Sequence, residues 1–328
     1  MTTFLLFGTF ALLMTMKVPI AFAMGLACIV VALFSPSLTL TFIAQGLVTA
    51  TDSFALMAIP FFVLAGDLMG KGGISRRLFD FINVFVGRIY GGTAIAAVIT
   101  CMFFAAISGS GPATVAAVGG MMIPMMIKEG YDRRFTTTLL ATAGALGIII
   151  PPSIPLVLFG IGSGTSIGDL FKGGMLPGIF ISFCLCIYVY FQSRKMGYRG
   201  NQEPFSFKRL WSSFKETIWA ILVPVIILGG IYGGIFTPTE AAVVAVFYSL
   251  FVSMFIYKEV RISDLFQILR DSAGSAATIL IVIGTATTFG TIMSLERVPE
   301  TIATAMLAIS SNPVIITLLI IVLLLIVG

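Results

Sequence analysis

The stretch Ser108-Gly109-Ser110-Gly111-Pro112-Ala113-Thr114 interrupts an apolar run that extends from Thr93 to Ile127. Each apolar flank is about 15 residues long, and a helix rises ~1.5 Å per residue, so neither flank comfortably spans a bilayer core of ~30 Å. Two half-length helices joined by Gly, Ser and Pro predict a re-entrant hairpin. Its tip places non-helical backbone at membrane depth, where it is tolerated only if it is buried in protein or lines a polar cavity. The stretch therefore predicts a binding site.

The composition is that of a membrane protein with several spans. Hydrophobic residues make up 58% of the 328 residues and charged residues 10%, whereas a soluble domain averages about 25% charged. The chain contains no histidine, which excludes serine–histidine hydrolysis and histidine-ligated metals. No paired intramembrane carboxylates and no nucleophile–base pair can be assembled. We therefore expect a protein that is not an enzyme.

A second break lies in the apolar segment 136–165, at Pro151-Pro152-Ser153-Ile154-Pro155. Three prolines in five residues cannot sit in a continuous helix. Hydroxyls and backbone carbonyls suit a hard cation such as sodium, and the N-termini of half-helices attract anions. The alternative is that small residues here serve only close helix packing.

One ion and substrate site is predicted from both breaks. Its candidate residues are Ser108, Gly109, Ser110, Gly111, Pro112, Thr114, Gly147, Pro151, Pro152 and Ser153. Sodium is expected to contact Ser108, Ser110 and backbone near Gly147. No cofactor is expected besides this coupling ion.

The remaining apolar segments predict the other spans. Residues 4–34 are expected to form one span, tilted or kinked at Lys17 and Pro19, because proline disrupts a helix. An amphipathic interfacial helix is expected at 74–89. Further spans are expected at 53–70, 174–193, 217–236, 239–257 and 272–294, with a polar loop at 194–215, an amphipathic piece at 260–270 and a short helix at 298–310.

The distribution of basic residues predicts the orientation. With the N-terminus in the cytoplasm and the hairpin entering from that side, 16 of the 19 basic residues fall inside. The positive-inside rule selects this arrangement. The 16 residues are Lys71, Arg76, Arg77, Arg88, Lys128, Arg133, Arg134, Arg194, Lys195, Arg199, Lys208, Arg209, Lys215, Lys258, Arg261 and Arg270. Because this loop bias explains the net charge of +5, no nucleic-acid partner is expected.

A weak internal repeat is also present. Gln45 and Gln267 each begin an amphipathic piece that leads through Asp-Ser into an apolar span. The two units have opposite orientation by the count of crossings, which is typical of secondary transporters. At the same offset of 222 residues, the counterpart of Ser108 would lie at position 330, so we expect the second hairpin tip just past Gly328.

Six motifs in order resemble the large membrane subunit of TRAP (tripartite ATP-independent periplasmic) transporters, over essentially the whole chain. They are Lys17–Gly25 (KVPIAFAMG), Ile59–Gly66 (IPFFVLAG), Ser108–Thr114 (SGSGPAT), Gly147–Ser153 (GIIIPPS), Asp169–Gly178 (DLFKGGMLPG) and Phe236–Ala242 (FTPTEAA).

The resemblance implies an all-α polytopic protein of the bacterial inner membrane with inverted repeats, a re-entrant hairpin and broken helices. It implies sodium-driven import of organic anions, such as sialic acid or C4-dicarboxylates, by an elevator mechanism. The implied partners are a small four-helix membrane subunit and a soluble periplasmic binding protein, besides the lipid bilayer. It assigns the tip at Ser108–Thr114 and the break at Gly147–Ser153 to sodium and substrate.

The predicted organisation has five parts. Residues 1–90 are first-repeat scaffold with an interfacial arm, 91–165 hold the hairpin and broken helix, and 166–215 form a linking span and cytoplasmic loop. Residues 216–312 are second-repeat scaffold, and 313–328 begin the second hairpin. The alternative function is a sodium/anion symporter of related architecture that needs no binding protein. A channel subunit is disfavoured, because broken hairpins at midplane favour alternating access.

Overall fold

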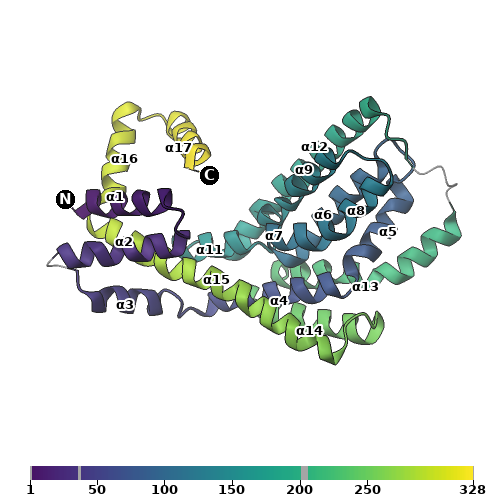
Figure 1. The fold of residues 1–328 in the computed structure, drawn as a ribbon, viewed down its shortest axis with the longest axis horizontal. Helices are drawn as coiled ribbons and strands as arrows, with labels where there is room; N and C mark the ends of the chain where they lie inside the picture. Colours follow the sequence, from purple (N-terminus) through teal and green to yellow (C-terminus); the bar gives the residue numbers. More distant parts are fainter. Residues whose placement is uncertain (1, 36–37, 201–205, 328) are drawn as a thin grey trace. The chain divides into compact units, whose positions relative to one another are not determined.

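The computed structural model describes residues 2–35, 38–200 and 206–327, and every regular element in these ranges is helical (Figure 1). Gly328, the last residue of the predicted segment 313–328, lies outside these ranges, and so does the side chain of Arg209. The described chain divides into two compact units, residues 1–53 with 277–328 and residues 54–276. The five-part organisation above stays a prediction.

The first unit holds the following helices: α1 (Thr2–Thr15), α2 (Ile20–Phe34), α3 (Leu40–Thr49), the second half of α15 (Ile262–Leu295), α16 (Val298–Ile309) and α17 (Pro313–Val327). The second unit holds the following elements: η1 (Phe54–Met57), α4 (Ala58–Lys71), α5 (Ile74–Val86), α6 (Gly92–Ser108), α7 (Gly111–Thr114), the π-helix η2 (Val115–Gly119), α8 (Gly120–Lys128), α9 (Arg133–Gly144), α10 (Leu146–Ile149), α11 (Ile154–Ser163), α12 (Ile167–Met196), α13 (Phe207–Tyr232), α14 (Pro238–Phe251) and the π-helix η3 (Val252–Ile256).

The all-α polytopic fold expected from the composition is confirmed. Within the described ranges, six helical segments are long and apolar enough to cross a membrane. They are Phe54–Lys71, Arg133–Ser163, Ile167–Met196, Leu210–Tyr232, Pro238–Ile256 and Ile262–Leu295. The second of them contains the Pro151-Pro152 break, so it consists of several helices in succession rather than one continuous helix.

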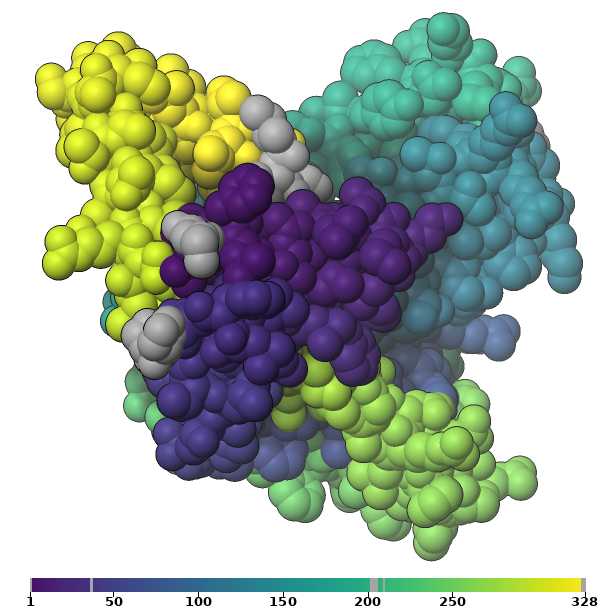
Figure 2. Space-filling model, turned by 60° about the vertical axis from the view of Figure 1, so that its left-hand side comes forward, coloured from purple at the N-terminus to yellow at the C-terminus, as the bar shows by residue number. Residues whose placement is uncertain are grey.

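The prediction of one span over 4–34 is wrong. The chain turns at Lys17, which has a left-handed φ of 61°, and α1 and α2 pack side by side. Leu6, near the start of α1, shares a buried cluster with Cys28 and Val31, near the end of α2, so the two helices run antiparallel. In Figure 2 they form the dark purple surface. Large apolar side chains of α2, such as Phe22, are exposed. Pro19 begins a helix here instead of kinking one, as its fixed φ favours.

Two further boundaries differ from expectation. The amphipathic piece at 260–270 and the span at 272–294 form one continuous helix, α15, because Asp271 and Ser272 continue the helical backbone. The predicted polar loop at 194–215 is shorter, because α12 reaches Met196 and α13 already begins at Phe207. Charged side chains are common at the ends of helices, so polarity alone did not locate the ends of these helices correctly.

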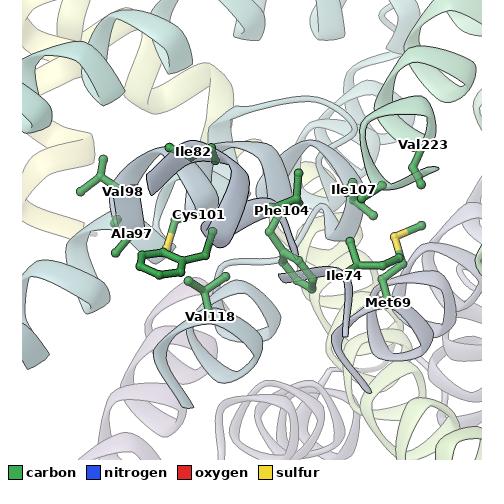
Figure 3. Close-up of a cluster of buried hydrophobic side chains, with 14 of the residues drawn as sticks. Met69, Ile74, Ile82, Ala97, Val98, Cys101, Phe104, Ile107, Val118 and Val223 are labelled. Atoms are coloured by element: carbon green, nitrogen blue, oxygen red, sulfur yellow. The ribbon is translucent and has the colours of Figure 1, made fainter. Parts of the chain in front are cut away.

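The core of the second unit surrounds α6. Its residues Ala97, Cys101 and Phe104 are fully buried. Figure 3 shows them among Met69 of α4, Ile74 and Ile82 of α5, Val118 of η2 and Val223 of α13. Small residues on α6 let these neighbours approach closely, which is how helices pack without a solvent-driven force in lipid. The hairpin is therefore held by packing on several sides.

The arm helix α5 confirms the amphipathic pattern predicted at 74–89. Ile74, Leu78 and Phe79 are buried, while Arg76 is exposed. Arg77 lies across the ring of Tyr257, with its guanidinium carbon 3.9 Å from the ring centroid, and its Nη2 is 3.2 Å from Glu259 Oε1. These contacts join α5 to the segment that follows η3.

Candidate functional site

The hairpin predicted around Ser108–Thr114 is present. Helix α6 forms one limb, and α7, η2 and α8 form the other. At the base, the buried hydroxyl of Thr93 donates to Glu129 Oε2 at 2.7 Å, which joins the first residues of one limb to the end of the other. Along the limbs, Val118 of η2 belongs to the same buried cluster as Phe104 of α6.

The tip turns on Gly109. Its φ of 62° lies in the left-handed region, and its N–H donates to Ala105 O at 3.1 Å, which closes α6. This is the common glycine termination of a helix, because an L side chain is strained at that φ. Ser110 is extended, and its hydroxyl accepts from Ala113 N at 3.4 Å, so it caps the returning limb with Pro112 in the first turn.

Three oxygen atoms gather at this tip. Ser108 Oγ lies 3.1 Å from Thr114 Oγ1 and 3.4 Å from Ser110 O, and Thr114 Oγ1 donates to Ser110 O at 2.9 Å. Ser108 and Thr114 are both fully buried. We call Ser108 Oγ, Thr114 Oγ1 and Ser110 O the oxygen triangle. Neutral oxygens this close together suit a hard cation, which takes hydroxyl and carbonyl ligands.

The predicted Pro-Pro break is also present. Helix α10 ends at Ile149, the peptide bond between Pro151 and Pro152 is cis, and α11 begins at Ile154. Ser153 is extended with φ −127° and ψ 124°, close to the −135° and 124° of Ser110. Its hydroxyl accepts from Leu156 N at 3.4 Å and donates to Ile148 O. It therefore bridges the two sides of the break.

The two breaks lie against each other through their backbones. Ile154 N donates to Gly109 O at 3.0 Å. A Cβ added at Gly147 would lie 2.6 Å from Ser110 O, and one added at Gly109 would lie 2.6 Å from Pro152 O. A Cβ on Gly111 would come 3.3 Å from Gly144 O. Glycine is needed at these positions because the two chains approach more closely than side chains allow.

The structure thus brings the ten predicted residues to one place. Gly109, Gly111, Gly147, Pro151, Pro152 and Ser153 are buried with Ser108 and Thr114, Ser110 is half-buried and Pro112 is exposed. Ser110 contributes two oxygens to this region: its carbonyl belongs to the oxygen triangle, while its hydroxyl caps a helix. Close backbone packing between the two breaks and a group of neighbouring oxygen atoms therefore occur together at these residues.

Sequence reasoning missed three contributors. The N–H of Ile154 donates the hydrogen bond that joins the two breaks. Gly144 has no side chain that would collide with the hairpin tip. Gly66 of α4 packs closely on Ser108, since a Cβ at Gly66 would lie 3.0 Å from Ser108 Cβ. The similarity of the two helix starts was visible in the sequence. Ser-x-Pro occurs at both Ser110 and Ser153, and this pattern is typical of a capped helix with proline in its first turn.

The electrostatics of the site are those of neutral dipoles. Among the described residues, no group of three or more Cys, Asp or Glu side chains could hold a metal ion. The first N–H groups of α11 are engaged, since Ile154 N donates to Gly109 O and Leu156 N to Ser153 Oγ. The arrangement therefore offers acceptors to a cation, and the positive end of a helix dipole to an anion beside it.

Comparison with known proteins places the chain among transporters. Residues 7–328 match the family described as "Tripartite ATP-independent periplasmic transporter, DctM component". The chain is 46% identical to the isethionate TRAP transporter permease protein DctMQ of Oleidesulfovibrio alaskensis over 98% of this chain and 51% of that protein. It is 36% identical to the C4-dicarboxylate TRAP transporter large permease protein DctM of Rhodobacter capsulatus (92% of this chain, 71% of that protein) and 35% identical to the sialic acid TRAP transporter large permease protein SiaM of Vibrio cholerae (98% and 75%). The chain spans about half the length of the isethionate relative.

Proposed function

Because the chain belongs to the DctM family, the large membrane component of tripartite ATP-independent periplasmic transporters, we propose that it imports an organic anion across the inner membrane, driven by sodium. The observation that carries this proposal is the oxygen triangle at the tip of a buried hairpin, against whose backbone the second break is packed. Non-helical backbone of this kind at membrane depth is typical of substrate sites in secondary transporters.

Sodium is the coupling ion that this site fits. The triangle offers two hydroxyls and one carbonyl, with no carboxylate among its members. Neutral oxygen ligands give weak, reversible binding of a hard monovalent cation, which a carrier needs in order to release its ion. Backbone near Gly147, whose Cβ position lies 2.6 Å from Ser110 O, would complete the ligand set.

The substrate is proposed to be an organic acid. Relatives are named for isethionate, C4-dicarboxylate and sialic acid, all of which are anions. An anion beside the bound sodium would also face the positive dipole end of α11, so the two ligands would stabilise each other's binding. This mutual dependence is the basis of the proposed coupling.

The proposed assembly and movement are those that the family resemblance implies. We propose that a periplasmic binding protein delivers the substrate, that a small membrane subunit accompanies this chain, and that the base of the hairpin faces the cytoplasm. The two broken helices share backbone contacts, so they would move together in an elevator-type step. A binding-protein-independent symporter would differ in one respect: uptake would persist without the delivered protein.

The test is uptake of labelled organic acids by the assembled transporter in proteoliposomes, with external sodium varied. Ser108→Ala and Thr114→Val each remove one oxygen of the triangle, so the sodium concentration for half-maximal uptake should rise in both. Thr137→Val, which removes an exposed hydroxyl on α9 that bonds only its own helix, is the matched control. Unchanged sodium dependence in both triangle variants, with normal expression, would reject the sodium site.

The role of Ser110 is separable in the same assay. Ser110→Ala removes the cap but keeps the carbonyl in the triangle. It should weaken sodium dependence less than Ser108→Ala does, and it should lower thermal stability more. Omitting the binding protein in a parallel set of vesicles separates the leading proposal from the alternative symporter.

A further inference from the structure

Three segments of the second unit meet at the base of the hairpin through Tyr198, which follows the end of α12. Gly91 N donates to Tyr198 O at 3.0 Å, and Asp132 N donates to Tyr198 Oη at 2.8 Å. The ring of Tyr198 lies 4.4 Å from that of Tyr131, centroid to centroid. The residues before α6, the turn after α8 and the end of α12 are therefore held side by side, and Figure 1 shows α12 running along the hairpin to this end.

These segments carry a dense group of cations, which we call the basic collar. Its members are Arg88, Lys128, Arg133, Arg134, Arg194, Lys195 and Arg199, all of them exposed. The ion pairs found among the described residues are Lys71–Asp271, Arg77–Glu259 and Lys172–Asp169, and none of them includes a collar residue.

The carboxylates nearby are already engaged. Glu129 accepts from the Thr93 hydroxyl at 2.7 Å, and Asp132 Oδ2 accepts from Phe135 N at 2.9 Å as the cap of α9. Counting both, the collar region still has five more positive than negative charges, as many as the net charge of the whole chain. This end of the hairpin therefore presents a concentrated positive field.

Arg133 and Arg134 are the informative members. They occupy the first two positions of α9, where the helix dipole presents partial positive charge and disfavours a cation. Lys128, Arg194 and Lys195 lie in the last turns of their helices, where a cation is favoured. The helix dipole therefore explains the latter three residues and not Arg133 and Arg134, which the positive-inside bias assigns to the cytoplasmic side, where anionic lipid headgroups would favour them.

We propose that the basic collar binds the headgroups of anionic phospholipids at the membrane surface. Exposed apolar side chains of Ile89 and Tyr90 adjoin Arg88, and exposed Ile127 adjoins Lys128, so the cations stand next to groups that enter the interface. Basic residues beside a membrane-embedded segment are attracted by anionic lipid. This proposal rests on the membrane fold and does not depend on the transport function.

The test uses the purified chain in a neutral detergent, titrated with phosphatidylglycerol while the thermal unfolding midpoint is measured. Lipid that binds the native state raises this midpoint by mass action. Each cation is expected to contribute about fivefold to affinity. Arg133→Gln with Arg134→Gln should therefore raise the half-maximal phosphatidylglycerol concentration about 25-fold, and added salt should weaken the wild-type response.

The matched control is Arg261→Gln with Arg270→Gln, which removes two exposed cations at the start of α15, a helix that carries no collar residue. It should respond to phosphatidylglycerol as the wild type does. Without lipid, the Arg133/Arg134 variant should be at least as stable as the wild type, which would exclude misfolding as the cause of a weaker response. A second collar variant, Arg199→Gln with Arg88→Gln, tests the same expectation independently. Equal responses in the collar and control variants would overturn the proposal. So would an equal response to phosphatidylcholine, or an equal response to inorganic phosphate, which would indicate a site for a soluble anion.

Discussion

Gly147→Ala should disable the site while the same change at Gly162 should not. A methyl group at Gly147 would lie 2.6 Å from Ser110 O, 2.7 Å from Ser110 C and 2.9 Å from Gly111 N. All three atoms belong to backbone, so no flexible side-chain end can move aside. The new Cβ must push α10 away from the hairpin tip, and the tip carries the oxygen triangle.

The size of the effect follows from the cost of overpacking. Inserting a carbon into a well-packed region costs about 1–3 kcal/mol, and backbone obstruction places Gly147→Ala near the upper end of that range. At about 1.4 kcal/mol per factor of ten, ~3 kcal/mol corresponds to roughly a hundredfold loss of the assembled geometry. Sodium-dependent uptake should fall by a comparable factor at low sodium, and less at saturating sodium, because the ion stabilises the assembled form.

The control is Gly162→Ala on α11, where an added Cβ meets nothing within 4 Å. Replacing an exposed helical glycine by alanine there should leave uptake unchanged and stabilise the helix by about 0.5–1 kcal/mol. Sodium-dependent initial rates in proteoliposomes and thermal unfolding midpoints should be measured for both variants. Wild-type sodium dependence in Gly147→Ala would refute the reasoning that close contact between the two breaks builds the site.

Three further outcomes are expected. Thr93→Val, which removes the hydrogen bond between the bases of the two hairpin limbs, should lower stability by about 1 kcal/mol, measured as a drop in the thermal unfolding midpoint that Thr93→Ser does not show. Phe104→Ala, at a fully buried position, should destabilise by about 3–5 kcal/mol, whereas Phe180→Ala, 64% exposed on α12, should change the unfolding midpoint little. Tyr198→Phe keeps the ring but loses the acceptor for Asp132 N, so it should cost about 1 kcal/mol and speed amide exchange at the turn after α8; unchanged exchange would contradict this role.

Local signals allowed both breaks to be predicted. Glycine at a left-handed position and proline near a helix start act within a few residues, so Gly109 and the Pro151-Pro152 pair were visible in the sequence. The contact between the breaks was not, because the bond from Ile154 N to Gly109 O joins residues 45 positions apart. The choice between the hydroxyl and the carbonyl of Ser110 in the oxygen triangle depends on the backbone and rotamer geometry of the tip, which the residue types do not specify.

The errors arose where hydropathy alone was used. An apolar run of 31 residues is compatible with one tilted span or with two short helices, and the turn at Lys17 together with the packing of α1 on α2 distinguishes them. The predicted boundary between the segments 260–270 and 272–294 rested on the polarity of Asp271 and Ser272. In the structure the Ser272 hydroxyl donates to Asp67 Oδ2 of α4, so this polar side chain finds a partner on a neighbouring helix without interrupting α15.

The antiparallel pairing of α1 and α2 changes the count of membrane crossings before α4 from odd to even, relative to a single span over the same residues. A single span carries the chain from one face to the other, whereas two antiparallel helices bring it back to the face it left. Thr2 at the start of α1 and Phe34 at the end of α2 therefore lie at the same end of this helix pair. If the basic loops after α4 are cytoplasmic and α4 makes the one net crossing before them, the amino terminus would face the periplasm, opposite to the side expected from a single span over 4–34, and we propose this orientation. A cysteine introduced at Thr3 should then react with an impermeant thiol reagent added to intact cells whose outer membrane has been opened.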